Sequence, residues 1–155
     1  MCDCKNGVCT CGGWMVPLAR VLLALVFIVA GWGKLTGFAG AEQMVAMGGF
    51  PMPTVFTVLA IIFELGGGLM LLSGFHTRLG AWMLIILTVI ATVAYHTDFS
   101  QQMTQIMFLK NVAIIGGLLL VAKVGAGAYG LSHWDRKICM AGEMCPDCKT
   151  GAGEK

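Results

Sequence analysis

Charged side chains are scarce in this chain, and their scarcity decides its class. Asp, Glu, Lys and Arg make up 12% of the 155 residues, against 57% hydrophobic residues. A soluble domain typically carries about 25% charged residues. The composition therefore excludes a soluble globular protein and predicts an integral membrane protein. The net charge of +2 gives no support for nucleic-acid binding.

The sequence also lacks the usual signs of a resident electron carrier. It has no nucleotide-binding loop, and its hydrophobic segments hold no pair of haem-ligating residues. If the protein takes part in electron transfer, the donor must be a partner protein or a metal held outside these segments.

Long hydrophobic segments are what the chain does contain. They predict four membrane spans, at residues 14–36, 54–74, 79–95 and 106–124. Each is close to the roughly 20 residues that a helix needs to cross a bilayer. The first could instead be a signal peptide, but it continues to Trp32 without a small-residue cleavage site. We therefore predict an all-α membrane protein, a four-transmembrane-helix bundle over residues 14–125 with tails at 1–13 and 126–155.

The positive charges predict how the bundle is oriented. Segments on the cytoplasmic side of a membrane collect Lys and Arg. Eight of the ten such residues lie on the side shared by both termini, and Lys34 and Lys110 lie on the other. Both termini are therefore predicted to be cytoplasmic. The first connection, Phe38 to Pro53, is rich in Gly and Pro and is predicted to be an outward-facing loop.

Glu64 stands near the middle of the second span, in a stretch otherwise free of charge. A carboxylate at this depth costs roughly 2.5 to 3.5 kcal/mol on insertion scales, so such a residue usually faces the bundle interior or a partner. With a rise of 1.5 Å per residue, Glu64 lies about 15 Å below the outer end of its span and Lys110 about 6 Å below its own. The candidate partners are Lys110 and Lys34. The alternative is a neutral, protonated carboxyl group.

Other polar residues are predicted to share the outer half of the bundle with Glu64. The candidate site residues are Lys34, Glu64, His96, Lys110 and Asn111, with Trp32 as an aromatic wall. We assign catalytic roles to Glu64, His96 and Lys110, as proton relays, and the binding of a quinone or small anion to the other three. A structural ion pair at Glu64, with Lys34 and His96 reaching the interface, is the alternative.

All seven cysteines lie outside the predicted spans. They are Cys2, Cys4, Cys9 and Cys11 before the first span, and Cys139, Cys145 and Cys148 after the last. On the reducing cytoplasmic side, metal binding or thiol exchange is expected rather than a permanent disulfide framework. Thiolates select Cu(I), Zn(II) or an Fe–S cluster, and the close Cys-x-Cys pairs favour Cu(I) slightly over zinc. Two tails with free thiols are the alternative.

Several short motifs, in order, resemble a known family. They are Arg20-Val-Leu-Leu, Gly31-Trp-Gly-Lys-Leu35, Gly49-Phe-Pro-Met-Pro53, Glu64-Leu-Gly-Gly-Gly-Leu, Ser73-Gly-Phe-His-Thr-Arg78, His96 and Lys110-Asn111. Together they are similar to the DoxX family of four-helix bacterial membrane proteins. The resemblance implies a multi-pass protein of the bacterial inner membrane, linked to redox biology. It does not cover the cysteine-bearing tails.

The resemblance leaves more than one function open. Some DoxX relatives are the membrane subunit of thiosulfate:quinone oxidoreductase, which implies a quinone-interacting component of a thiosulfate or thiol oxidising system. Others accompany soluble enzymes in stress defence, which implies a non-enzymatic adaptor for soluble redox proteins. The third hypothesis is a thiophilic metal-binding membrane protein. Besides the lipid bilayer, the expected partners include a second copy of the chain, because Gly33-x-x-x-Gly37 has the spacing of a helix-dimerisation face.

Overall fold

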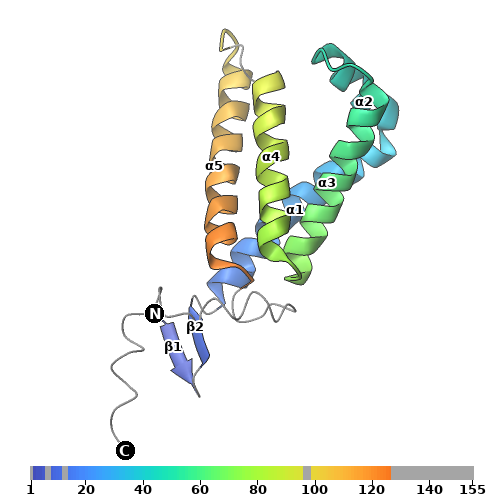
Figure 1. Cartoon of the computed structure of the whole chain (residues 1–155). Helices are drawn as coiled ribbons and strands as arrows, with labels where there is room; N and C mark the ends of the chain where they lie inside the picture. The colour runs from blue at the N-terminus through green and yellow to red at the C-terminus, as the bar shows by residue number, and fades with distance from the viewer. Residues whose placement is uncertain (1, 6–7, 12–13, 96–98, 127–155) are drawn as a thin grey trace, which may run out of the picture.

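The protein is a helical bundle preceded by a short β-hairpin (Figure 1). The computed structural model describes residues 2–5, 8–11, 14–95 and 99–126. The strands are β1 (Cys2–Lys5) and β2 (Val8–Cys11), and the helices are α1 (Met15–Thr36), α2 (Phe38–Met47), α3 (Pro53–Ser73), α4 (Thr77–Tyr95) and α5 (Gln102–Val124). The hairpin lies beyond the end of the bundle where α1 begins, and α2 lies at the opposite end.

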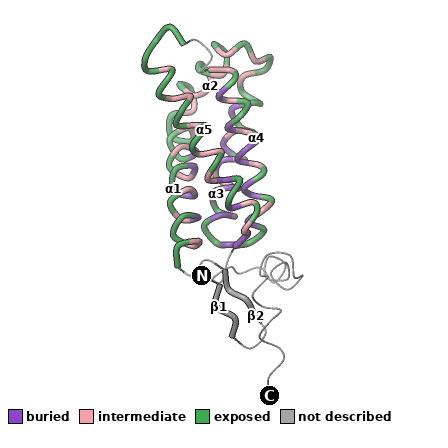
Figure 2. Tube along the Cα trace, turned by 90° about the vertical axis from the view of Figure 1, so that its left-hand side faces the viewer, coloured by how far each residue is buried: buried purple, intermediate pink, exposed green. Residues whose placement is uncertain are grey.

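The helices α1, α3, α4 and α5 are long and apolar enough to cross a membrane. They confirm the predicted four-helix membrane fold. The helix starts differ by a few residues from the predicted spans: α4 begins at Thr77 rather than Leu79, and α5 at Gln102 rather than Ile106. Figure 2 shows exposed residues along the outer surface of the helices and buried ones toward the inside, as expected for helices that face lipid.

The first connection is not the loop that the sequence predicts. Residues Phe38–Met47 form helix α2 between Gly37 and Gly48. The glycines interrupt the helix at both ends, whereas the segment between them is rich in Ala, Met, Glu and Gln, which favour helix. The hydroxyl of Thr54 donates a hydrogen bond to the carboxylate of Glu42 and so ties α2 to the start of α3.

Neighbouring spans pack in a chain of contacts, α1 against α3, α3 against α4, and α4 against α5. The closest approach of α3 and α4 requires glycine. A Cβ atom on Gly67 would lie 2.8 Å from Leu84 Cγ, and one on Gly80 would lie 3.1 Å from the carbonyl oxygen of Gly67. Small residues at such crossings let membrane helices pack backbone to backbone.

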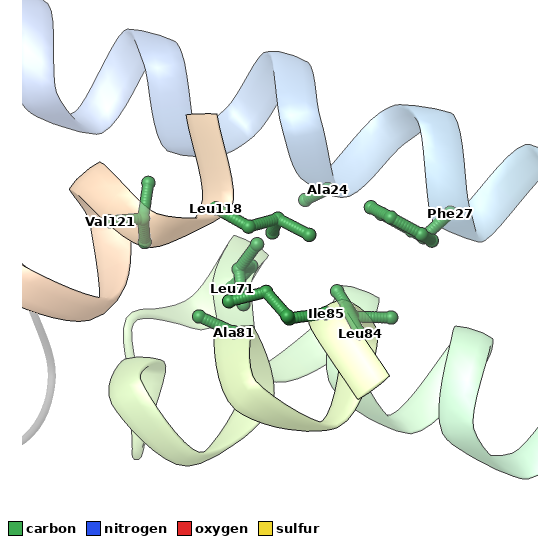
Figure 3. Close-up of a cluster of buried hydrophobic side chains, with 8 residues drawn as sticks. All are labelled: Ala24, Phe27, Leu71, Ala81, Leu84, Ile85, Leu118 and Val121. Carbon is green, nitrogen blue, oxygen red and sulfur yellow. The ribbon is translucent and has the colours of Figure 1, made fainter. Parts of the chain in front are cut away.

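The core lies at the end of the bundle where α1 begins and α5 ends. Its buried side chains come from all four spans: Ala24, Phe27, Leu71, Ala81, Leu84, Ile85, Leu118 and Val121. Figure 3 shows them gathered between the helices. This half of the bundle is therefore closed by apolar contacts.

Two arginines hydrogen-bond to the last turn of α5 and to a residue just after it, in the same half of the bundle as the core. The guanidinium of Arg20 donates a hydrogen bond of 2.5 Å to the carbonyl of Ala126, and that of Arg78 donates one of 3.1 Å to the carbonyl of Lys123. The carbonyl of Lys123 is in the last turn of α5, where carbonyls have no partner within the helix and carry the negative end of its dipole, and that of Ala126 follows shortly after the helix end. The arginines supply both a donor and a favourable charge there.

Candidate functional site

A pocket of about 500 Å³ opens in the other half of the bundle, on the side of α2. Its walls are mostly small or apolar residues of α1, α2, α3 and α4, and the described residues that line it include none from α5. Such a volume and such a lining are typical of small-molecule sites. The charged residues among those that line it are Lys34 and Glu64.

Lys34 and Glu64 form an ion pair at the pocket wall. The ammonium of Lys34 donates to both carboxylate oxygens of Glu64, at 2.7 and 2.8 Å. The side chain of Glu64 is only 11% exposed and that of Lys34 is 34% exposed. Glu64, the costly charge in the second span, therefore has Lys34 as its partner, one of the two lysines that the sequence offered.

The helix geometry brings these two side chains together. Cβ atoms tilt toward the N-terminus of their own helix. Lys34 lies near the end of α1 and Glu64 near the middle of the antiparallel α3, so the two side chains lean toward each other. Gly31 lets the helices approach at this level, because a Cβ there would lie 2.9 Å from Leu65 Cγ and 3.1 Å from Glu64 Cβ.

Aromatic side chains close the pocket toward α2. The ring centroid of Phe50 lies 5.0 Å from that of Phe56 and 6.4 Å from that of Tyr95. Gly48, which follows α2, packs against the Tyr95 ring so closely that a Cβ would lie 2.6 Å from it. The residues after α2 and the end of α4 thus form one wall.

The other two polar candidates on α5 lie away from this pocket. Lys110 is exposed, and its ammonium lies 3.3 Å from the sulfur of Met107. Asn111 donates a hydrogen bond of 2.9 Å to Thr92 Oγ1, and Thr92 in turn donates to the carbonyl of Thr88. Asn111 therefore joins α5 to α4, while Lys110 faces the surroundings of the bundle.

Of the remaining candidates, Trp32 lies at the surface, and the others have no described side chain. Trp32 is 61% exposed and does not appear in the pocket wall. His96 lies outside the described residues, as do Cys139, Cys145 and Cys148. Cys2, Cys4, Cys9 and Cys11 lie on β1 and β2, of which only the backbone is described.

Sequence reasoning did not identify three residues of the pocket wall, Met44, Phe50 and Phe56. Met44 and Phe50 were missed because the first connection was interpreted as a loop, whereas Phe56 lies in α3, within a predicted span where nothing marked it as a pocket residue. The helix-forming residues between Gly37 and Gly48 were the signal that could have revealed α2.

Comparison with known proteins places the chain in a family. The DoxX family model matches residues 15–97. Inner membrane protein YqjF of Escherichia coli (strain K12) is 44% identical over 121 residues, covering 76% of this chain and 89% of the relative. Inner membrane protein YphA of the same organism is 35% identical over 124 residues, covering 77% of this chain and 89% of the relative. No solved structure matches the chain.

Proposed function

This chain belongs to the DoxX family of multi-pass inner-membrane proteins, and we propose that its pocket binds the head group of a quinone as part of a membrane-bound redox system. The observation that carries the proposal is the Lys34–Glu64 pair in the wall of an otherwise apolar pocket. The pair offers a proton donor and a proton acceptor at the same place, while the small and aromatic residues around it suit a flat, apolar ring.

The charge balance favours a neutral ligand over an anion. The ammonium of Lys34 is already neutralised by Glu64, at 2.7 Å. A dianion such as thiosulfate would have to compete with the carboxylate for that ammonium, next to a negative charge in a medium of low polarity. A quinone carbonyl can accept a hydrogen bond from Lys34 without separating the pair, since the ammonium has three donors.

Glu64 is suited to moving protons. A quinone takes up two electrons and two protons when it becomes a quinol. The Glu64 carboxylate can relay one of these protons, taking it from the Lys34 ammonium beside it and passing it to the ring oxygen. In this proposal the electrons come from a thiol or thiosulfate that a soluble partner protein oxidises. The chain supplies the quinone site and the proton donor.

A bulky substitution tests the binding step without removing either charge. Ala91 lines the pocket, so Ala91→Phe should fill part of it and weaken the binding of a short-chain ubiquinone to the purified protein at least about tenfold, which is about 1.4 kcal/mol. The matched control is Ala113→Phe, which adds the same bulk at an exposed position of α5. Titration calorimetry in detergent measures both. Equal affinity for the two variants, or no binding by the unsubstituted chain, contradicts the proposal.

A second variant tests the proton step. Glu64→Gln keeps the shape of the side chain but cannot exchange a proton, so quinone binding should persist while quinol formation falls to background. Quinol formation is followed in membrane vesicles that contain the chain, supplied with a soluble cell extract and thiosulfate. Thermal unfolding in detergent checks that the variant is folded. Full quinol formation by a folded Glu64→Gln protein would show that Glu64 transfers no proton.

A further inference from the structure

The N-terminal hairpin places four cysteines in a regular array. β1 and β2 pair antiparallel, with Cys2 opposite Cys11 and Cys4 opposite Cys9. The pairs between and beside them are Asp3 with Thr10 and Lys5 with Val8. Every cysteine of this segment thus stands directly across from another.

The register also assigns all four cysteines to one face. Successive residues of a strand alternate between the two faces of a sheet, so residues two apart share a face. Cys2 and Cys4 share one face of β1, and their partners Cys11 and Cys9 share the same face of β2. Asp3, Lys5, Val8 and Thr10 occupy the other face.

The spacing of the array suits a single metal ion. Opposite residues in an antiparallel pair have Cα atoms about 4.5 to 5.5 Å apart, and neighbours on one face of a strand are about 6.8 Å apart. A soft metal binds thiolate sulfur at about 2.3 Å, so one ion above the centre of the array is within reach of all four positions. We propose that the β1–β2 hairpin is a four-thiolate site for one soft cation of the Cu(I) and Zn(II) class, held by Cys2, Cys4, Cys9 and Cys11.

The small size of the hairpin gives a physical reason for such a metal. Two strands of four residues each cannot bury a core, and an isolated two-stranded hairpin is marginally stable in water. A metal bound across both strands adds its binding free energy to the folding of the segment. Each thiol loses its proton as its sulfur binds the metal, so binding releases protons and strengthens as the pH rises.

The site is distinct from the pocket of the bundle. Among the side chains that the structure describes, no three His, Cys, Asp or Glu residues are grouped to hold a metal. The hairpin also lies beyond the end of the bundle opposite to α2 (Figure 1). Metal binding by the hairpin therefore does not depend on quinone binding in the pocket.

Metal titration of the full-length chain in detergent tests the site. The reduced, metal-free protein is titrated under anaerobic conditions with Zn(II) and, separately, with Cu(I), each against a competing chelator. We expect one ion per chain that is lost when all four hairpin cysteines are replaced by serine. Loss of a hydrogen-bond partner of a metal ligand costs about 10- to 100-fold in affinity, so each single Cys→Ser change in the hairpin should cost more than about tenfold.

Two control variants define the site. The first replaces Cys139, Cys145 and Cys148 by serine, and the second changes the opposite face of the hairpin, with Asp3→Asn and Thr10→Val. Both should keep the ion. The proposal is overturned if the unsubstituted chain binds neither metal, if the four-serine variant still binds it, or if the first control loses it. It is equally overturned if alkylation shows the hairpin thiols joined as disulfides after reducing purification.

Discussion

At the scale of single residues, the Lys34–Glu64 pair makes a buried carboxylate tolerable in the middle of a membrane helix. The two charges compensate each other, with Lys34 Nζ 2.7 Å from Glu64 Oε1. Removing one partner of a buried pair leaves an uncompensated charge, whereas replacing both by apolar residues is often neutral. The stability of the bundle should therefore depend on the pair as a unit.

This dependence can be measured with a double-mutant cycle of Lys34→Met, Glu64→Leu and the variant that carries both. Lys34→Met should lower the free energy of unfolding by about 3 to 5 kcal/mol, because Glu64 loses its partner. The double variant Lys34→Met/Glu64→Leu should recover most of that loss. Reversible unfolding in detergent is the measurement, and Lys110→Met, at an exposed lysine, is the control with an expected change within about 0.5 kcal/mol. If the effects of the two single substitutions simply add in the double variant, the residues are not coupled.

The sequence predicted that Glu64 needs a partner but did not choose between Lys34 and Lys110. Depth along each helix can be counted from the sequence, whereas the rotation of each helix about its axis depends on its neighbours. Lys34 faces α3 because glycines bring α1 and α3 together, and Lys110 is exposed on α5. This difference arises from tertiary packing, which one sequence does not reveal.

At the scale of elements, glycines set how closely the spans approach one another. Gly66 and Gly67 are neighbours on α3 with different surroundings. A Cβ on Gly67 would lie 2.8 Å from Leu84 Cγ and 3.3 Å from the carbonyl oxygen of Gly80, whereas a Cβ on Gly66 would have nothing within 4 Å. Gly66 is therefore open to substitution, whereas Gly67 is required by the contact with α4.

The adjacent glycines provide a matched pair of variants. Gly67→Ala should lower the free energy of unfolding by about 1 to 3 kcal/mol, since overpacking forces α3 and α4 apart. Gly66→Ala should be neutral or stabilising by up to about 1 kcal/mol, because alanine favours helix. Thermal unfolding of both proteins in the same detergent compares them. A smaller loss for Gly67→Ala than for Gly66→Ala would refute the close contact.

The element boundaries show what hydropathy predicts well and what it misses. The four spans were predicted to within a few residues because a bilayer imposes one length on every crossing helix. Helix α2 was missed because it is short and flanked by glycines. None of its residues is buried, so its sequence needs no regular spacing of hydrophobic residues that would have indicated a helix. The pocket depends on that helix, so its wall could be predicted only in part.

At the scale of the whole molecule, the hairpin lies beyond one end of the bundle and α2 lies at the other (Figure 1). Residues of α2 line the pocket, so the pocket and the hairpin are at opposite ends. The distribution of Lys and Arg predicts that the hairpin end is cytoplasmic, with eight of the ten positive residues on that side. The pocket then opens toward the outer half of the membrane. Any exchange of electrons between a cytoplasmic partner and the pocket would have to cross part of the bilayer.

Thiol labelling tests this orientation. A membrane-impermeant maleimide applied to intact bacterial cells should not react with the native cysteines, which are predicted to be cytoplasmic. The same reagent should react with Gln43→Cys, on α2, in a chain whose seven native cysteines are replaced by serine. Labelling after cell lysis is the control for reactivity. If the native cysteines are labelled and Gln43→Cys is protected, the topology is the opposite of the one predicted.

The buried core and the two arginine contacts with α5 all lie at the hairpin end, while the pocket end is held by the Lys34–Glu64 pair, the aromatic wall and α2. The two halves of the bundle therefore differ in the kind of contact that holds them together. If the pocket binds a quinone, as we propose, we expect its entry from the lipid to displace α2 and the aromatic rings and to leave the apolar core intact. Substitutions that weaken the core should lower the lifetime of the folded protein without changing how fast the pocket exchanges its contents.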